Sequence, residues 1–298
     1  MWVIALAAWG EFYRRKLKLV ALPSISAALA YATEPAQIIL HTDEPDDFAD
    51  TNFPCEVMFR RFQGGTEGVA IYNSLGQADK MAIELVPKGA NIAFITSDVM
   101  VSREFFAASE KRLAEGARCI VGHAARTLVA LEDCPAGLAA RKLLDFCFLK
   151  EHRHPITAGC FYGQGTNQIA WVTYFEGPYG IVARAFHLFP FAVKNDRHLS
   201  NFGGPTVDSD LFELFSRNEI YVACDPDEMA WAEISDLKER CEMPQLSNPS
   251  SIDSIVEYAR RAATPLQRWI FSHRVVVQGT GDDHLDEAPG NEILRILG

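Results

Sequence analysis

Asp98 follows the most apolar strand-length run of the sequence, residues 90–95. Two hydroxyl-bearing residues, Thr96 and Ser97, separate it from that run. A carboxylate just past a buried strand sits at the carboxyl edge of a sheet, where α/β proteins bind ligands. Mg²⁺ and Mn²⁺ prefer such hard oxygen ligands, and a cation held there neutralises a diphosphate. Asp98 is therefore predicted to contact a metal or a nucleotide. The alternative is an aspartate that caps a helix beginning near Ser102 or ends the strand in a turn.

A second pair of carboxylates, Asp208 and Asp210, is separated by a single residue. In an extended segment alternate side chains face the same side, so both could converge on one cation or one substrate hydroxyl. Either carboxylate could then act as a general base. If the segment instead opens a helix running to Phe215, the positive end of that helix would stabilise the same two charges. Both interpretations stay open.

Two further groups carry candidate chemistry. Asp225, Asp227 and Glu228 follow the strand-like run 220–224, and they form either a ligand site or a solvated acidic turn. His187 stands among bulky apolar residues, where a histidine can be a metal ligand or a general base. The alternative for His187 is a core histidine with satisfied hydrogen bonds.

The elements that must position these groups alternate between strand length and helix length through the first 125 residues. Strands are expected at 2–7, 37–41, 55–62, 90–95 and 119–121, and helices at 11–29 (interrupted at Pro23), 67–86 and 103–114. This order is typical of a parallel sheet with crossover helices. Later segments are a helix at 135–152, a β-rich region at 169–193, a strand at 220–224, a helical stretch at 251–271 and a polar tail at 279–289, expected to be a loop or flexible arm.

Composition excludes several classes of protein. The 298 residues include 28 Lys and Arg against 39 Asp and Glu, a net charge of −11 that argues against a nucleic-acid partner. The seven cysteines form no Cys-x-x-Cys pair, which favours a reduced, cytoplasmic setting. No apolar run reaches the ~20 residues that span a bilayer, so membrane contact would be peripheral. Glycine-rich dinucleotide, Walker and Gly-x-Ser-x-Gly motifs are absent from the sequence.

Several short stretches in a fixed order, taken together, resemble a group of poorly characterised bacterial proteins that look like GT-A-type glycosyltransferases of surface polysaccharide synthesis. They span about residues 9–235 and are found at 9–12, 22–24, 41–42, 95–98, 184–190, 206–210 and 221–228. The resemblance implies an α/β fold with a GT-A-like (Rossmann-like) nucleotide-binding mixed sheet flanked by helices in residues 1–130. A β-rich, acceptor-side half at 131–298 would be integrated with it in one continuous domain.

The resemblance also implies a set of ligand-binding residues. A nucleotide-sugar would bind across the first half, in contact with Thr42, Asp43, Ser97 and Asp98, and Asp98 would hold Mg²⁺ or Mn²⁺. The family signature is Asp-x-Asp, whereas Thr96 stands at its first position here. One carboxylate and a hydroxyl hold a divalent ion less firmly than two carboxylates.

The chain also departs from the family pattern in a stretch where the family has two histidines that could bind a metal. The family has His-Leu-His-Pro where this chain has His187-Leu188-Phe189-Pro190. His187 is therefore the only candidate metal ligand of that stretch.

The activity implied is transfer of a sugar to a saccharide or glycolipid acceptor, with Asp208 or Asp210 as general base, in the cytoplasm and at the inner face of the membrane for a lipid acceptor. One alternative is nucleotidyl or S-adenosylmethionine-dependent transfer, in which Asp43 and Glu44 would hold a ribose. Another is a catalytically inactive scaffold, motivated by Thr96. The sequence leaves the donor, the acceptor and the oligomeric state open.

Overall fold

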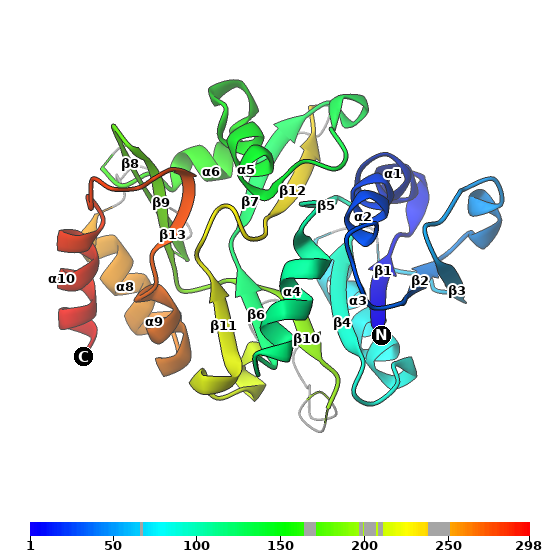
Figure 1. The fold of residues 1–298 in the computed structure, drawn as a ribbon. Coiled ribbons are helices and arrows are strands. Elements are labelled where there is room, and N and C mark those ends of the chain that lie inside the picture. The colour runs from blue at the N-terminus through cyan, green and yellow to red at the C-terminus, as the bar shows by residue number, and fades with distance from the viewer. Residues whose placement is uncertain (66–67, 164–170, 197–198, 200–206, 208–210, 238–250) are drawn as a thin grey trace.

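The computed structural model describes residues 1–65, 68–163, 171–196, 199, 207, 211–237 and 251–298 (Figure 1). Its strands are β1 (Trp2–Ala7), β2 (Ala36–Thr42), β3 (Glu56–Arg61), β4 (Asn91–Thr96), β5 (Val99–Val101), β6 (Cys119–Gly122), β7 (Ala124–Val129), β8 (Val172–Gly177), β9 (Gly180–Ala185), β10 (Phe189–Lys194), β11 (Ile220–Ala223), β12 (Trp231–Asp236) and β13 (Val275–Gly279). Its helices are α1 (Gly10–Lys16), α2 (Leu22–Leu29), α3 (Val69–Leu85), α4 (Phe105–Ala114), α5 (Ala140–Phe148), α6 (Pro155–Gly159), α8 (Ile252–Ala262), α9 (Pro265–Phe271) and α10 (Glu287–Leu297).

The main sheet has seven strands in the order β11-β6-β10-β4-β1-β2-β3. β1 runs parallel to both β2 and β4, β2 is parallel to β3, and β6 is parallel to β11. β10 is antiparallel to its two neighbours, β4 and β6, so the sheet is mixed. The prediction of an α/β fold with a mixed sheet flanked by helices is confirmed.

The alternation of side chains along β1 explains how both faces of the sheet are covered. Trp2, Ile4 and Leu6 pack in one apolar cluster with residues of α2 and α4, whereas Val3 and Ala5 belong to a second cluster that includes residues of α3. In Figure 1, α1, α2 and α4 lie in front of the sheet and α3 lies behind it. Because β1 is buried on both faces, it reads as a continuous apolar run in the sequence.

Two small sheets complete the fold. The strand order β5-β12-β7 forms one of them, and β13-β9-β8 forms the other, beside α8, α9 and α10 (Figure 1). β5 and β7 were not predicted from the sequence. β5 has three residues, and β7 follows β6 after a single residue, so neither has a hydrophobic pattern of its own.

The acidic tail at 279–289, predicted to be a loop or flexible arm, is a loop up to Asp286, and its last residues belong to α10. The chain leaves β13 at Gly279 and starts α10 at Glu287, and the Asp286 carboxylate between them is completely buried. Arg184 Nε and Arg274 Nε each donate to one Asp286 oxygen, at 2.6 and 2.7 Å. Two cations thus compensate a buried charge that composition alone assigned to solvent.

The first helical segment is not split at Pro23, where the sequence predicted an interruption. A π-helical turn over Leu17–Ala21 joins α1 to α2 just before Pro23, which is the second residue of α2. No helix among the residues placed by the structure is long and apolar enough to cross a lipid bilayer.

Candidate functional site at the carboxyl end of the main sheet

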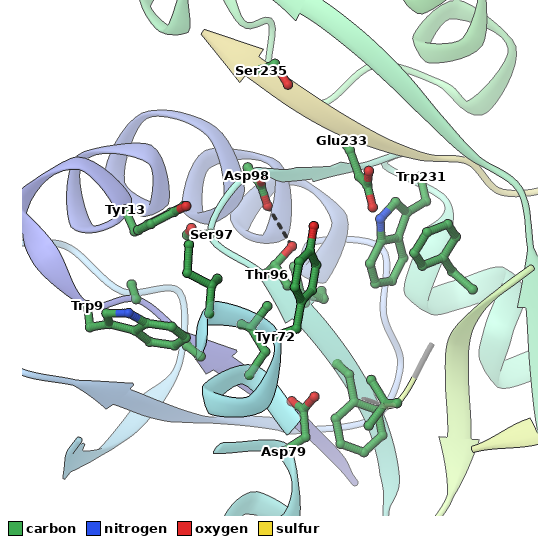
Figure 2. Close-up of a pocket in the computed structure, with 18 of the residues that line it drawn as sticks. Trp9, Tyr13, Tyr72, Asp79, Thr96, Ser97, Asp98, Trp231, Glu233 and Ser235 are labelled. Carbon is green, nitrogen blue, oxygen red and sulfur yellow. Dashed lines mark hydrogen bonds between the residues drawn. The ribbon is translucent and has the colours of Figure 1, made fainter. Parts of the chain in front are cut away.

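A cavity of about 460 Å³ opens at the carboxyl ends of β1 and β4 (Figure 2). Its walls come from the residues that follow these two strands, from α3, and from β7 and β12 of a small sheet. The main sheet runs outward from β1 through β2 to β3 on one side and continues with β4 on the other. Such a reversal of strand order is where open α/β sheets bind ligands, because the two loops diverge and leave a crevice.

Asp98 lines this cavity from a tight turn between β4 and β5. Its side chain is 30% exposed, and one carboxylate oxygen accepts a hydrogen bond from Thr96 Oγ1 at 2.7 Å (Figure 2). The Asp98 carbonyl accepts a hydrogen bond from Ile234 N of β12 at 2.8 Å. The alternative of a helix cap is wrong, since β5 intervenes and α4 begins only at Phe105.

Lys16 at the end of α1 holds the other oxygen of the Asp98 carboxylate. Its Nζ lies 3.7 Å from Asp98 Oδ2 and donates to the Ile234 carbonyl at 3.1 Å. The Lys16 side chain is only 2% exposed, and its ammonium lies 4.9 Å from the centre of the Phe12 ring. A buried ammonium is costly unless it is paired, so these contacts fix both Lys16 and Asp98.

Arg126 and Glu233 form a second ion pair at the cavity. They are register partners on the parallel strands β7 and β12, with Arg126 Nε 2.7 Å from Glu233 Oε2. Glu233 above all, and Asp98 more weakly, raise the pKa of Arg126. Sequence reasoning missed both residues. A lone arginine inside the apolar run 119–129 was the available signal, and β12 carried none.

Aromatic side chains make much of the remaining wall. Trp231 is 3% exposed, and its ring stacks on Phe191 with centroids 5.2 Å apart. Its Nε1 is buried and has no hydrogen-bond partner within the part of the chain that the structure describes. Tyr72 projects from α3 and is 58% exposed, and Figure 2 shows its hydroxyl end directed toward Trp231 and Glu233.

Only some of the residues predicted to bind a nucleotide line the cavity. Ser97 and Asp98 do, whereas Thr42 and Asp43 are not among its lining residues. Asp43 instead accepts hydrogen bonds from Gly10 N at 2.9 Å and from Arg14 Nη1 at 2.6 Å. Partial burial raises the pKa of Asp43, but these two partners outweigh it and hold that pKa below its usual value. Asp43 therefore anchors the start of α1.

His187 packs beside the cavity and is not one of its lining residues. Its ring centre lies 5.3 Å from those of Trp171 and Phe189, and burial, with the nearby charge of Arg126, lowers its pKa to about 4. The imidazole is therefore neutral at neutral pH. No group of three or more His, Cys, Asp or Glu side chains with the geometry of a metal site is found in the described ranges, so Asp98 and His187 belong to no such group.

The remaining acidic candidates have different outcomes. Asp208 and Asp210 lie outside the described residues, although their neighbour Val207 lines the cavity. Asp227 is paired with Arg141 through two hydrogen bonds of 2.5 and 2.6 Å. The acidic stretch 225–228 contributes no residue to the cavity lining, and it is not wholly the solvated turn that the sequence offered, because the Glu228 carboxylate is 11% exposed and paired with Arg112.

Comparisons with known proteins give distant structural likenesses. No family model and no curated protein sequence matches the chain. S. aureus TarS, residues 1–349 in complex with UDP-GlcNAc, matches 98% of this chain and 70% of its own at 11% identity, with a TM-score of 0.41. A 4-diphosphocytidyl-2C-methyl-D-erythritol synthase from Anaerococcus prevotii matches 88% of this chain and 95% of its own at 10% identity, with a TM-score of 0.36. Mouse xyloside xylosyltransferase 1 matches 41% of this chain and 52% of its own at 15% identity, with a TM-score of 0.26. These scores are too low to support an argument about function, which must come from the cavity itself.

Proposed function

We propose that the chain is a glycosyltransferase that moves a sugar from a nucleotide-sugar donor to a saccharide or glycolipid acceptor. The observation that supports this most is the cavity at the β1/β4 reversal point with the Asp98 carboxylate at its edge. A diphosphate bound there would meet the carboxyl ends of parallel strands, the general ligand position of α/β sheets. The resemblance of the sequence to GT-A-type glycosyltransferases independently assigns Asp98 to the same ligand.

A divalent cation fits this site only in a limited way. Asp98 is a hard oxygen ligand exposed to the cavity, and Mg²⁺ commonly binds through one or two carboxylates plus the substrate's phosphates. Asp98 would hold such an ion, whose charge would offset that of the leaving diphosphate. His187 does not fit as the second ligand, because its ring packs between two aromatic side chains outside the cavity wall.

The groups of this chain support the reaction by position and charge. The bond from the anomeric carbon to the β-phosphate oxygen breaks, and its electron pair leaves with the diphosphate. The acceptor oxygen bonds to the anomeric carbon, and its proton passes to a carboxylate, for which we propose Asp208 or Asp210. Val207, which lines the cavity, supports this proposal because it directly precedes Asp208. Lys16 and Thr96 keep Asp98 oriented throughout.

A non-catalytic scaffold is the second candidate, and one observation favours it. Both oxygens of Asp98 already have partners, Thr96 and Lys16, which compete with any cation for the carboxylate. Asp43, which would hold the ribose of S-adenosylmethionine in a third interpretation, is absent from the cavity lining and bound to Arg14. The scaffold is therefore the alternative that an observation on Asp98 favours.

The decisive experiment is a titration of the protein with UDP-, GDP- and CMP-sugars, with and without Mn²⁺, followed by calorimetry and by release of free nucleotide. We expect one nucleotide class to bind and to be hydrolysed slowly, and Asp98→Ala to abolish turnover in a folded protein. Binding without any turnover would favour the scaffold. Absence of binding by every donor would contradict the proposed function.

A further inference from the structure

We propose that the cavity-facing side of β12, with Tyr72 opposite, binds the sugar of the donor and distinguishes it from the bare nucleoside diphosphate. We call Trp231, Glu233 and Ser235 the β12 wall. All three line the cavity, as alternate residues of one strand do. The inference rests on the proposed function and assigns the residues that recognise the transferred group.

The indole of Trp231 carries the first part of the argument. Its Nε1 is a buried donor for which the described structure contains no acceptor, and the side chain is 3% exposed at the cavity wall. An unsatisfied buried N–H costs about 1–3 kcal/mol, so such a group calls for a partner that enters from outside. In Figure 2 the nitrogen edge of Trp231 faces the space between Glu233 and Tyr72. A ligand oxygen in that space would accept the hydrogen bond.

The charges at this end of the cavity indicate what kind of ligand brings that oxygen. Glu233 and Asp98 are both carboxylates, and the Arg126 guanidinium is already paired with Glu233. A phosphate placed against Glu233 would meet a carboxylate, whereas the divalent cation that offsets the charge of a diphosphate would be held at Asp98. Sugar hydroxyls, in contrast, donate to carboxylates and accept from the indole N–H, and the neighbouring aromatic faces cover apolar ring atoms.

A backbone hydrogen bond between the Asp98 turn and β12 places the sugar next to the diphosphate. The Asp98 carbonyl is hydrogen-bonded to Ile234 N at 2.8 Å, between Glu233 and Ser235 of the β12 wall. A diphosphate that reaches Asp98 therefore brings its sugar substituent to the β12 wall without a further movement of the protein. The Arg126 pair holds Glu233 in one orientation for that contact.

The test compares sugar-linked and free nucleoside diphosphates by calorimetry in Mn²⁺, with the pairs UDP-N-acetylglucosamine and UDP, and GDP-mannose and GDP. We expect Trp231→Phe, which keeps the ring stacked on Phe191 but removes the N–H, to weaken the sugar-linked ligand about 3- to 10-fold. Glu233→Gln should weaken it at least as much. The affinity for the free nucleotide should not change.

Two controls keep the result interpretable. Trp269→Phe makes the same chemical change outside the cavity lining and should alter neither affinity. Tyr72→Phe removes a hydroxyl from an exposed side chain opposite the β12 wall, so it tests the same sugar site even if Trp231→Phe folds poorly. We expect Tyr72→Phe to weaken only the sugar-linked ligand.

The outcomes separate this inference from the function on which it rests. Equal weakening of both ligands of a pair, or no weakening of either, would overturn the assignment of the β12 wall while leaving a nucleotide-binding protein. If the wild-type protein binds no nucleotide, free or sugar-linked, the proposed function falls and the inference with it.

Discussion

Asp286 and Asp98 are both carboxylates paired with buried cations, yet they occupy opposite kinds of surroundings. Asp286 is completely buried, and Arg184 and Arg274 each donate to one of its oxygens at 2.6 and 2.7 Å. Asp98 is 30% exposed to a cavity, and its contact with the Lys16 ammonium is a longer 3.7 Å. The first carboxylate is closed to any ligand, whereas the second presents part of its surface to one.

This difference shows how ion pairing separates a structural charge from a functional one. A buried carboxylate with two short guanidinium contacts joins three elements of the C-terminal region, here β9, the loop before β13 and the start of α10. A carboxylate with one hydroxyl and one distant ammonium stays oriented and still accessible. We expect substitutions at Asp286 to act on stability and those at Asp98 to act on ligand binding.

The largest expected effect is that of Asp286→Asn. Removing this charge leaves Arg184 buried without its counter-ion, which typically costs about 3–5 kcal/mol in the free energy of unfolding. Denaturation by urea measures it. Glu292→Gln, in an exposed ion pair with Arg295 on the same helix, is the matched control and should leave stability unchanged. Equal stability of Asp286→Asn and wild type would contradict the structural role proposed for Asp286.

Asp98→Asn should have the reverse profile. Loss of the carboxylate that would hold a divalent cation against the diphosphate should lower donor turnover about 10²- to 10³-fold, as removal of one electrostatic group in an active site does. The stability should fall by only about 1 kcal/mol, because the Asp98 carboxylate is 30% exposed and its contact with the Lys16 ammonium is a long 3.7 Å. Parallel urea curves and nucleotide-release assays measure the two. An unfolding as severe as that of Asp286→Asn would mean that Asp98 is a structural ion-pair partner.

Gly290→Ala tests how tightly the side chains around the buried Asp286 carboxylate are packed. An added Cβ would lie 2.6 Å from Arg184 Nε and 2.9 Å from its Cδ, so the guanidinium would have to leave Asp286 or the helix would have to shift. Overpacking of this kind costs about 1–3 kcal/mol. Thermal unfolding should report the loss, while the exposed neighbour Asn291→Ala should not. An unchanged melting temperature would show that Arg184 can move at little cost.

The smallest expected effect is on the pKa values of two buried histidines, His187 and His123. Burial lowers the pKa of both His187 and His123 to about 4, and the Arg126 charge contributes only at His187. Arg126→Met should therefore raise the pKa of His187, which stays below 6.5 because burial is the larger cause, and leave that of His123 unchanged. Two-dimensional NMR titration of the imidazole signals measures both. A shift of equal size at the two rings would indicate a general loosening of the fold.

The sign of the accompanying stability change follows from linkage. Each of these histidines binds its proton near pH 6.5 when unfolded and only near pH 4 when folded, so the unfolded state carries more protons between these values. Stability is therefore present above pH 6.5 and is lost as the pH falls toward 4. Arg126→Met should narrow this pH window for His187 and leave that of His123 unchanged.

Hydrophobic periodicity predicted the first half of the fold and the place of one site residue. The run at 90–95 indicated a buried strand, and that strand is β4, with Asp98 just beyond its carboxyl end at the cavity. The same logic predicted β1, α3 and α4. Local pattern suffices there because a strand buried on both faces and an amphipathic helix each carry their own signal.

Partners distant in sequence were decided by the tertiary structure alone. Arg126 and Glu233 are 107 positions apart and become neighbours only because β7 pairs with β12 in one particular register. Asp43, predicted as a nucleotide ligand, binds Gly10 and Arg14 of α1 and is not among the residues that line the cavity. Asp286 looked solvated and instead closes a buried cluster.

The sequence by itself thus determined the alternating strands and helices of the first half and an aspartate just past the end of β4, whereas the antiparallel strand β10 that makes the sheet mixed comes from the second half. Tertiary structure decided which charged and aromatic side chains surround that aspartate and which carboxylates are sealed. The physical reason is that strand and helix periods are local properties of the chain. Whether a charge is buried, paired or open to a ligand depends on which remote cation or strand packs against it.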